Sequence, residues 1–203
     1  MGSQDSYNTV SEFEKTLAEF YGSPYAVATD CCTHAIELSL RYLDIKNVSC
    51  PKHTYLSVPF TFKKLGLEWK FTSEEWNDYY YIGDTNIVDA AVFWKQNGYI
   101  KNTLMCLSFQ FKKHLSIGRA GAILTDNYES YVGLKKLAHD GRFGNLPWAK
   151  QDISSMGYHY YLTPELAKIG LDKFNAAVNK TPTPWSWQDY PDLSTFSVFN
   201  EKL

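Results

Sequence analysis

Residues 104–115 read LMCLSFQFKKHL, an uninterrupted apolar run that gives way to polar and basic residues. A short apolar run without alternation is typical of a strand buried on both faces, so we predict a strand over Leu104–Phe109. Similar apolar runs predict further strands at Tyr25–Ala28, Val48–Cys50, Trp69–Phe71, Ile87–Ala91 and Ala120–Thr125. The segment Thr72–Asp84 is polar and aromatic without a clear period, and we predict a loop there.

Between these runs the apolar residues recur at helical spacing, as Phe13, Leu17 and Phe20 do in the first segment. We predict helices over Val10–Tyr21, Thr33–Leu43, Leu56–Leu65, Tyr128–Ala138 and Pro164–Asn179, with Thr163 as the N-cap of the last. Strands that alternate with helices predict an α/β fold, a three-layer sandwich with a mostly parallel central sheet. In such sheets ligands bind beyond the carboxyl ends of the strands, here the loops after Ala28, Cys50, Val88 and Phe109.

The composition is that of an ordinary globular protein, with 203 residues, 44% apolar residues and a formal net charge of −2. This charge gives no electrostatic reason to expect nucleic acid or an anionic membrane as a partner. The four cysteines lack the spacing of a zinc or redox motif, and we expect them to be reduced. We see no signal peptide or membrane span and expect a cytoplasmic protein; the opening residues match the loose myristoylation pattern, but a start or cloning sequence explains them better.

Two of the predicted loops carry groups that could bind an anion and an aromatic ring. The turn from Asp30 through Cys31 and Cys32 to Thr33 precedes a predicted helix, whose free N–H groups could bind a phosphate. An ordinary N-cap by Thr33 explains the same residues. Tyr55 follows a strand end, where its ring could stack on a ligand, although an exposed or core tyrosine is the commoner case.

The other two loops carry a carboxylate and an amine. Asp89 ends an apolar strand, where a carboxylate needs a partner such as a protonated pyridine nitrogen, a helix cap or a salt bridge. Lys113 follows the strand quoted first, and a desolvated lysine can act as a nucleophile toward carbonyls. A solvated surface pair with Lys112 is the alternative.

The order of these elements resembles the DegT/DnrJ/EryC1/StrS family of sugar aminotransferases, which depend on pyridoxal 5'-phosphate (PLP). The segment from Phe20 to Ala28 is similar to the family's opening phrase, and Asp30 to Ile36 is similar to its Asn-Ser-Gly-Thr-Ala-Ala-Leu element. Further matches are Pro51 to Tyr55, Val88 to Ala91, Gly118 to Thr125, His139 to Arg142 and Gly157 to Thr163. The most specific is Ser108 to Leu115, against the family's Ser-Phe-His-x-x-Lys-Asn/His-Leu. The resemblance covers roughly Phe13 to Phe174.

This resemblance implies the PLP-transferase fold type I and assigns roles to individual residues. It makes Lys113 the lysine that forms the Schiff base with PLP, and Asp89 the partner of the pyridine nitrogen. Tyr55 takes the ring-stacking position, and Ser108 contacts the phosphate. Cys32, Thr33 and His159 complete the cofactor-binding set, the last where the family has an Asn that reaches a neighbouring subunit's phosphate.

The chain also departs from the family pattern. It is much shorter, and it lacks most of one strand–helix–strand region and the usual C-terminal small domain. Cys32 stands where the family has Gly, which could restrict the backbone of the phosphate turn. Val92 replaces a Gln or His near the cofactor, and Arg119 and Ala120 replace a Glu-Gly pair.

The function implied is transfer of an amino group, with glutamate as the donor and a nucleotide-linked keto-sugar as the acceptor, by a homodimer with shared active sites. A related dehydratase would carry His at the position of Lys113, and a non-catalytic relative that binds PLP or a partner is a further alternative. We predict a reduced PLP-binding aminotransferase domain at 1–180 and a C-terminal tail at 181–203. The tail contains Pro182, Pro184 and Pro191 together with two tryptophans, so we expect it to be extended and to dock on a surface. Packing across the dimer is one such arrangement.

Overall fold

The computed structural model describes residues 3–144 and 146–200, with side chains from residue 8 onward. Its central sheet has five strands in the order β1 (Tyr25–Thr29), β7 (Gly121–Thr125), β6 (Leu104–Ser108), β5 (Ile87–Asp89) and β4 (Tyr80–Tyr81). Two further strands, β2 (Asn47–Pro51) and β3 (Glu68–Thr72), pair with each other in parallel. Each strand predicted from an apolar run is present, with ends that differ by one or two residues. The Met1-Gly2 start of the myristoylation pattern lies outside the described residues.

The strand directions correct one prediction, because the sheet is mixed rather than mostly parallel. β5 and β6 are parallel, whereas β7 runs antiparallel to both β1 and β6, and β4 runs antiparallel to β5. Parallel neighbours need a long crossover, usually a helix. Only loops of residues 82–86 and 109–120 join β4 to β5 and β6 to β7, so these pairs reverse direction. β4 also lies inside the segment Thr72–Asp84, which we predicted to be a loop.

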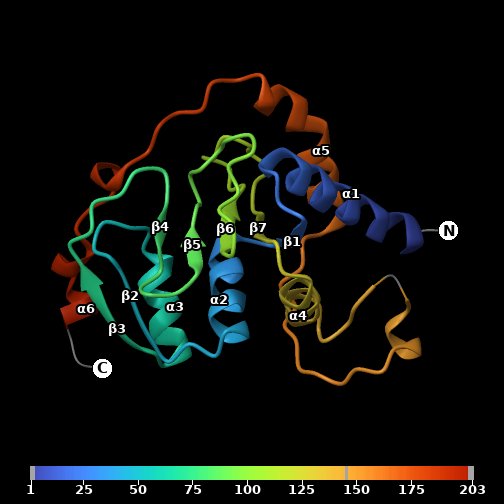
Figure 1. Cartoon of the computed structure of the whole chain (residues 1–203), viewed down its shortest axis with the longest axis horizontal. Coiled ribbons are helices and arrows are strands. Elements are labelled where there is room, and N and C mark those ends of the chain that lie inside the picture. Colours follow the sequence, from blue (N-terminus) through green and yellow to red (C-terminus); the bar gives the residue numbers. More distant parts are fainter. Residues whose placement is uncertain (1–2, 145, 201–203) are drawn as a thin grey trace.

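Helices cover both faces of the sheet, which confirms the three-layer α/β sandwich. On one face, α1 (Ser3–Tyr21) and α5 (Pro164–Val178) lie side by side (Figure 1). Their side chains, among them Phe13, Leu17 and Phe174, pack against Ala26 and Ala28 of β1. The other face is covered by α2 (Cys32–Tyr42), α3 (Ser57–Leu65) and α4 (Tyr128–Ala138), whose apolar side chains pack against Val27, Cys106 and Ile123. The alternation along β1 therefore supplies two cores, one on each face.

Local sequence explains where several helices begin and end. The side chain of Asn127 accepts a hydrogen bond from the N–H of Ser130 and caps α4. Gly66 ends α3 with a φ of 66°, in the left-handed region that favours glycine. Thr163 is the N-cap residue of α5 as predicted, although its side chain makes no capping hydrogen bond. Among the described residues, the four cysteines are free, and no helix is long and apolar enough to cross a membrane.

The segment after α5 returns across the chain instead of leaving it. Figure 1 shows this segment passing from α5 to the side of the molecule where β3 and β4 lie. It contains two 3-10 turns (Trp187–Asp189 and Leu193–Thr195) and the short helix α6 (Ser197–Asn200), and Leu193 is 1% exposed. The tail predicted to dock on a surface therefore packs against its own chain.

Candidate active site

A cavity of about 540 Å³ opens where β1, β2, β5 and β6 end, the edge at which the sequence predicted a ligand. This volume lies within the usual range of small-molecule sites, roughly 300–1,000 Å³. The predicted site residues that line it are Cys32, Thr33, Tyr55, Asp89, Ser108 and Lys113. The structure thus brings together residues from four loops that are far apart in the sequence.

The N-terminus of α2 presents backbone N–H groups at this cavity. Cys31 is the N-cap residue, with extended backbone and no side-chain capping hydrogen bond, so Thr33 is not the cap. Thr33 instead lies 2.7 Å from Ser57 through the two hydroxyl oxygens. Cys32 is the first helical residue and has no positive φ, so its side chain does not restrict the turn. The first-turn N–H groups without a side-chain cap are suited to an anion.

Close approach of β7 to this turn requires a glycine. A Cβ atom at Gly121 would lie 2.5 Å from both the carbonyl carbon of Cys31 and the nitrogen of Cys32. These are backbone atoms that cannot move aside as a flexible side chain could. The strand β7 and the turn that begins α2 are therefore packed directly on each other.

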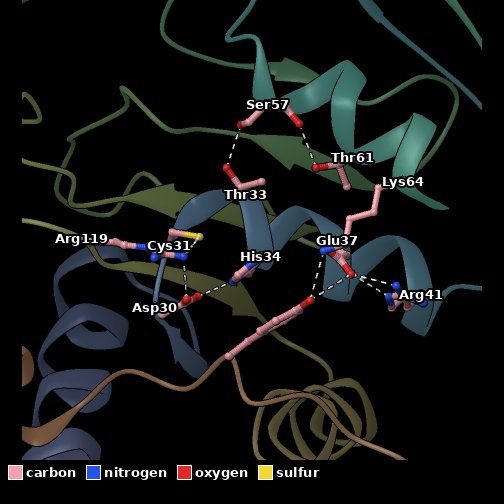
Figure 2. Close-up of polar contacts among 11 residues, drawn as sticks. Asp30, Cys31, Thr33, His34, Glu37, Arg41, Ser57, Thr61, Lys64 and Arg119 are labelled. Carbon is pink, nitrogen blue, oxygen red and sulfur yellow. Dashed lines mark hydrogen bonds and ion pairs between the residues drawn. The ribbon is translucent and has the colours of Figure 1, made fainter.

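An ion-pair cluster stands at the rim of the same turn (Figure 2). The Asp30 carboxylate lies 2.6 Å from His34 Nδ1 and 3.0 Å from an Arg119 guanidinium nitrogen. Burial opposes protonation of His34, but its hydrogen bonds to Asp30 and Cys31 raise its pKa to about 9. Asp30, Cys31 and His34 could each offer a metal-ligand atom within 4.8 Å of the others. Because two cations already neutralise Asp30, we assign the cluster to holding the turn.

Asp89 is buried (6% exposed) and accepts hydrogen bonds at both carboxylate oxygens. The Tyr80 hydroxyl donates to Oδ2 at 2.5 Å, and the Ala91 N–H donates to Oδ1 at 3.1 Å. Thr54 lies 2.5 Å from the same Tyr80 hydroxyl. Burial raises the pKa of Asp89, although the hydrogen bonds from Tyr80 and Ala91 and the charge of Lys113 oppose the rise. Among the described residues no ion pair or helix cap involves Asp89, so the carboxylate still lacks a close positive partner.

Lys113 is the partly buried lysine of the basic run after β6. The backbone N–H of Lys113 donates to the Gln110 carbonyl at 2.7 Å and closes a turn, and the residue lines the cavity. Burial lowers the pKa of Lys113, and the positive charge of Lys112 lowers it further, whereas Cys32 and Asp89 oppose the shift. Lys112 also lines the cavity but is exposed. His114 Nε2 lies 2.7 Å from the Ala177 carbonyl oxygen, and His114 is not among the lining residues, which argues against a register slip.

The remaining lining residues include an exposed tyrosine and three residues that differ from the family's sequence pattern. Tyr55 lines the cavity with 61% of its surface exposed, so its ring is accessible for stacking. Val92, Arg119 and Ala120 line it as well. These three positions, at which this chain differs from the family's sequence pattern, therefore lie in the site itself.

His159 is the predicted site residue that does not line this cavity. Its Nδ1 lies 2.9 Å from Asp140, its Nε2 lies 3.1 Å from the Tyr161 hydroxyl, and its side chain is 71% exposed. The role assigned to it concerns a neighbouring subunit and stays a prediction.

Sequence reasoning missed the lining residues Tyr80, Trp76, Trp185 and Tyr190. Tyr80 belongs to the segment predicted as a loop, and its pairing with Asp89 depends on the β4–β5 hairpin. Trp185 and Tyr190 come from the C-terminal tail, whose prolines and tryptophans were a visible signal without an assigned position.

Comparison with known proteins supports the resemblance. The sequence model of the DegT/DnrJ/EryC1/StrS aminotransferase family matches residues 2–93, and no curated protein matches the sequence. The sugar aminotransferase CalS13 from Micromonospora echinospora superposes with a TM-score of 0.68 and 15% identity, covering 84% of this chain and 61% of CalS13. The PLP form of Spr1654 from Streptococcus pneumoniae superposes with a TM-score of 0.69 and 18% identity, covering 84% of this chain and 59% of Spr1654. DesI, solved in the presence of its TDP-sugar product, superposes with a TM-score of 0.64 and 17% identity, covering 84% of this chain and 53% of DesI.

These comparisons confirm the fold type I architecture of PLP-dependent aminotransferases in partial form. They also confirm the family resemblance over residues 2–93, a range that includes Asp89 but ends before Ser108 and Lys113. The chain spans between 53% and 61% of the length of these structures.

Proposed function

We propose that this chain, which matches the DegT/DnrJ/EryC1/StrS aminotransferase family over residues 2–93, is a PLP-dependent sugar aminotransferase. The observation that carries the proposal is the convergence of Asp89, Lys113 and the N-terminus of α2 on one cavity. A buried carboxylate, a partly buried amine and an anion-binding helix end are the three groups that PLP requires. Each of them belongs to a different loop.

The residues fit the cofactor part by part. The first-turn N–H groups of α2, with Thr33 and Ser108, would hold the phosphate. Asp89, whose pKa burial raises, would gain its missing positive partner from a protonated pyridine nitrogen. Tyr55 offers an exposed ring for stacking, and Lys113 offers the amine for covalent attachment.

The chemistry supplied by bound PLP is that of an electron sink for negative charge at the carbon bearing the amino group. Lys113 would hold the cofactor, and its free amine would move a proton between the donor carbon that bears the amino group and the cofactor's C4′. Its burial favours the neutral amine, the form that can accept a proton. Asp89 would hold the proton on the ring nitrogen, and Tyr80 would keep the carboxylate in place.

The substrates we propose are an amino acid, glutamate by family resemblance, and a nucleotide-linked keto-sugar. CalS13 is a sugar aminotransferase, and DesI was solved with a TDP-sugar product, which supports a sugar nucleotide as acceptor. The open cavity of about 540 Å³ leaves room for a substrate beside the cofactor.

We also propose that the protein works as a homodimer. The segment between α4 and α5 projects from the body of the chain (Figure 1) and exposes large apolar side chains, namely Leu146, Trp148, Ile153 and Met156. Exposed apolar side chains that cluster on one segment are typical of an interface. His159 follows this segment, which would place it near a neighbouring subunit. Analytical ultracentrifugation should give twice the chain mass, and a monomer at all concentrations would contradict this part.

The proposal is tested by the visible absorbance of purified protein with added PLP, before and after glutamate. We expect a protein-bound cofactor band that glutamate converts to the spectrum of the amino form. Lys113→Ala should abolish the bound band, whereas the neighbouring Lys112→Ala should keep it. A band that glutamate leaves unchanged would favour a non-catalytic PLP-binding relative, and the absence of any band in the wild type would refute the cofactor assignment.

A further inference from the structure

The C-terminal tail is hydrogen-bonded to earlier parts of the chain at two points. The Asp78 N–H donates to the Trp185 carbonyl at 2.9 Å, and the Leu193 N–H donates to the Lys52 carbonyl at 2.9 Å. The Lys52 ammonium also lies 2.7 Å from the Asp192 carboxylate. Side chains between these anchors therefore have fixed positions, and they can build a binding site.

Trp185 is a tail residue that contacts the proposed reaction centre. The Lys113 ammonium lies 5.2 Å from the centroid of the Trp185 ring, within the range of a cation–π contact. The ring also packs against Tyr190 with 6.1 Å between centroids. Trp185 lines the main cavity and, in addition, a smaller cavity of about 130 Å³ beside it. The two cavities are adjacent and share six lining residues, namely Ala91, Val92, Ser108, Lys112, Lys113 and Trp185.

The smaller cavity has a lining of one charge sign. Its charged residues are Lys112, Lys113 and Lys180, and none of the described residues that line it is an aspartate or glutamate. Trp94 and Trp185 supply flat apolar walls. Lys112 and Lys180 bring positive charge to one small space beside the Lys113 amine, and an anion bound there would be attracted to both.

We propose that this smaller cavity is a carboxylate-binding subsite for the amino donor, built by Lys112 and Lys180 with Trp185 as its wall. The proposal rests on the proposed aminotransferase function, because it is a donor carboxylate that must lie next to Lys113. A volume of about 130 Å³ accepts a carboxylate-bearing arm but not a nucleotide, so the sugar nucleotide must use the main cavity. The tail residue Trp185 would then form one wall of the donor site.

The test measures binding of glutarate, a dicarboxylate without an amino group, to the cofactor-free protein by isothermal titration calorimetry. Loss of one exposed ion pair changes affinity by up to about fivefold, so Lys180→Ala should weaken binding by about twofold to fivefold and Lys180→Arg should restore it. Lys168→Ala is the matched control, because Lys168 is an exposed α5 lysine paired with Asp172 and lines neither cavity.

Two outcomes would overturn the subsite. One is glutarate affinity that is equal in the wild type and in Lys180→Ala, and the other is equal weakening in Lys180→Ala and Lys168→Ala. Competition by inorganic phosphate with no effect of Lys180→Ala would place the dicarboxylate at α2 and also refute the proposal. Since the measurement uses no cofactor, its result is independent of PLP attachment to Lys113, which tests the proposed function separately.

Discussion

Replacing Tyr80 by phenylalanine should weaken PLP binding, because it removes a buried hydroxyl group that donates a hydrogen bond to Asp89. Tyr80 is 3% exposed, and its hydroxyl donates to Asp89 at 2.5 Å. A hydrogen bond to a charged group contributes about 1.5–3 kcal/mol, which corresponds to roughly tenfold to hundredfold in an equilibrium constant. Loss of this donor disfavours the charged carboxylate, the form that would pair with a protonated ring nitrogen. We therefore expect the PLP dissociation constant of Tyr80→Phe to rise by about tenfold to hundredfold at neutral pH.

The assay is an absorbance titration with PLP, run beside urea unfolding to show that the variant is folded. Unfolding should also shift, because the buried Thr54 hydroxyl loses its partner at a cost of about 1–3 kcal/mol. Tyr81→Phe is the matched control, since Tyr81 is the adjacent β4 residue, is 40% exposed and does not line the cavity. A folded Tyr80→Phe protein with wild-type PLP affinity would refute the role given to the Tyr80–Asp89 pair.

Three further changes probe the scaffold of the site. Gly121→Ala should lower PLP affinity and cost about 1–3 kcal/mol of unfolding free energy, because its Cβ would meet the backbone of Cys32 at 2.5 Å; calorimetry and a PLP titration would check both effects. Leu17→Ala, at a fully buried α1 position, should cost about 2–5 kcal/mol in urea unfolding with PLP affinity unchanged in the folded protein. Burial opposes protonation of His34, but its interactions with Asp30 and Cys31 raise its pKa from 6.5 to about 9, so their stabilisation is complete below pH 6.5 and is lost as pH rises through about 9. After discounting for solvent screening it amounts to at most about 2 kcal/mol, and His34→Gln should flatten the unfolding free energy across that pH window, whereas an unchanged slope would contradict the ion pair.

Apolar runs located the strands because burial on both faces of a sheet requires them. Leu104 to Leu107 are almost fully buried in β6, and the predicted helix Tyr128–Ala138 has the bounds of α4. Strand direction was harder to predict, since it depends on whether a connection contains a crossover helix. β4 was missed because two residues leave no periodic pattern, although one of them supports Asp89.

The site was predictable as far as it lies in contiguous motifs. Asp89 ends an apolar strand and Lys113 lies in the loop that follows another, so the sheet edge brings them together. Tyr80 and Trp185 could not be placed in the same way, because one depends on a hairpin and the other on a tail that crosses the molecule. The cation–π contact between Lys113 and Trp185 joins parts of the chain that no local pattern connects.

The central claim, that Lys113 carries the cofactor, is tested most directly by borohydride reduction of the protein incubated with PLP, followed by peptide mass spectrometry. Reduction makes a cofactor–lysine bond permanent, and it identifies the lysine whether or not the enzyme turns over. We expect a single modified peptide with the added mass on Lys113. Modification of Lys112 instead, scattered modification of exposed lysines, or no modification at all would contradict it.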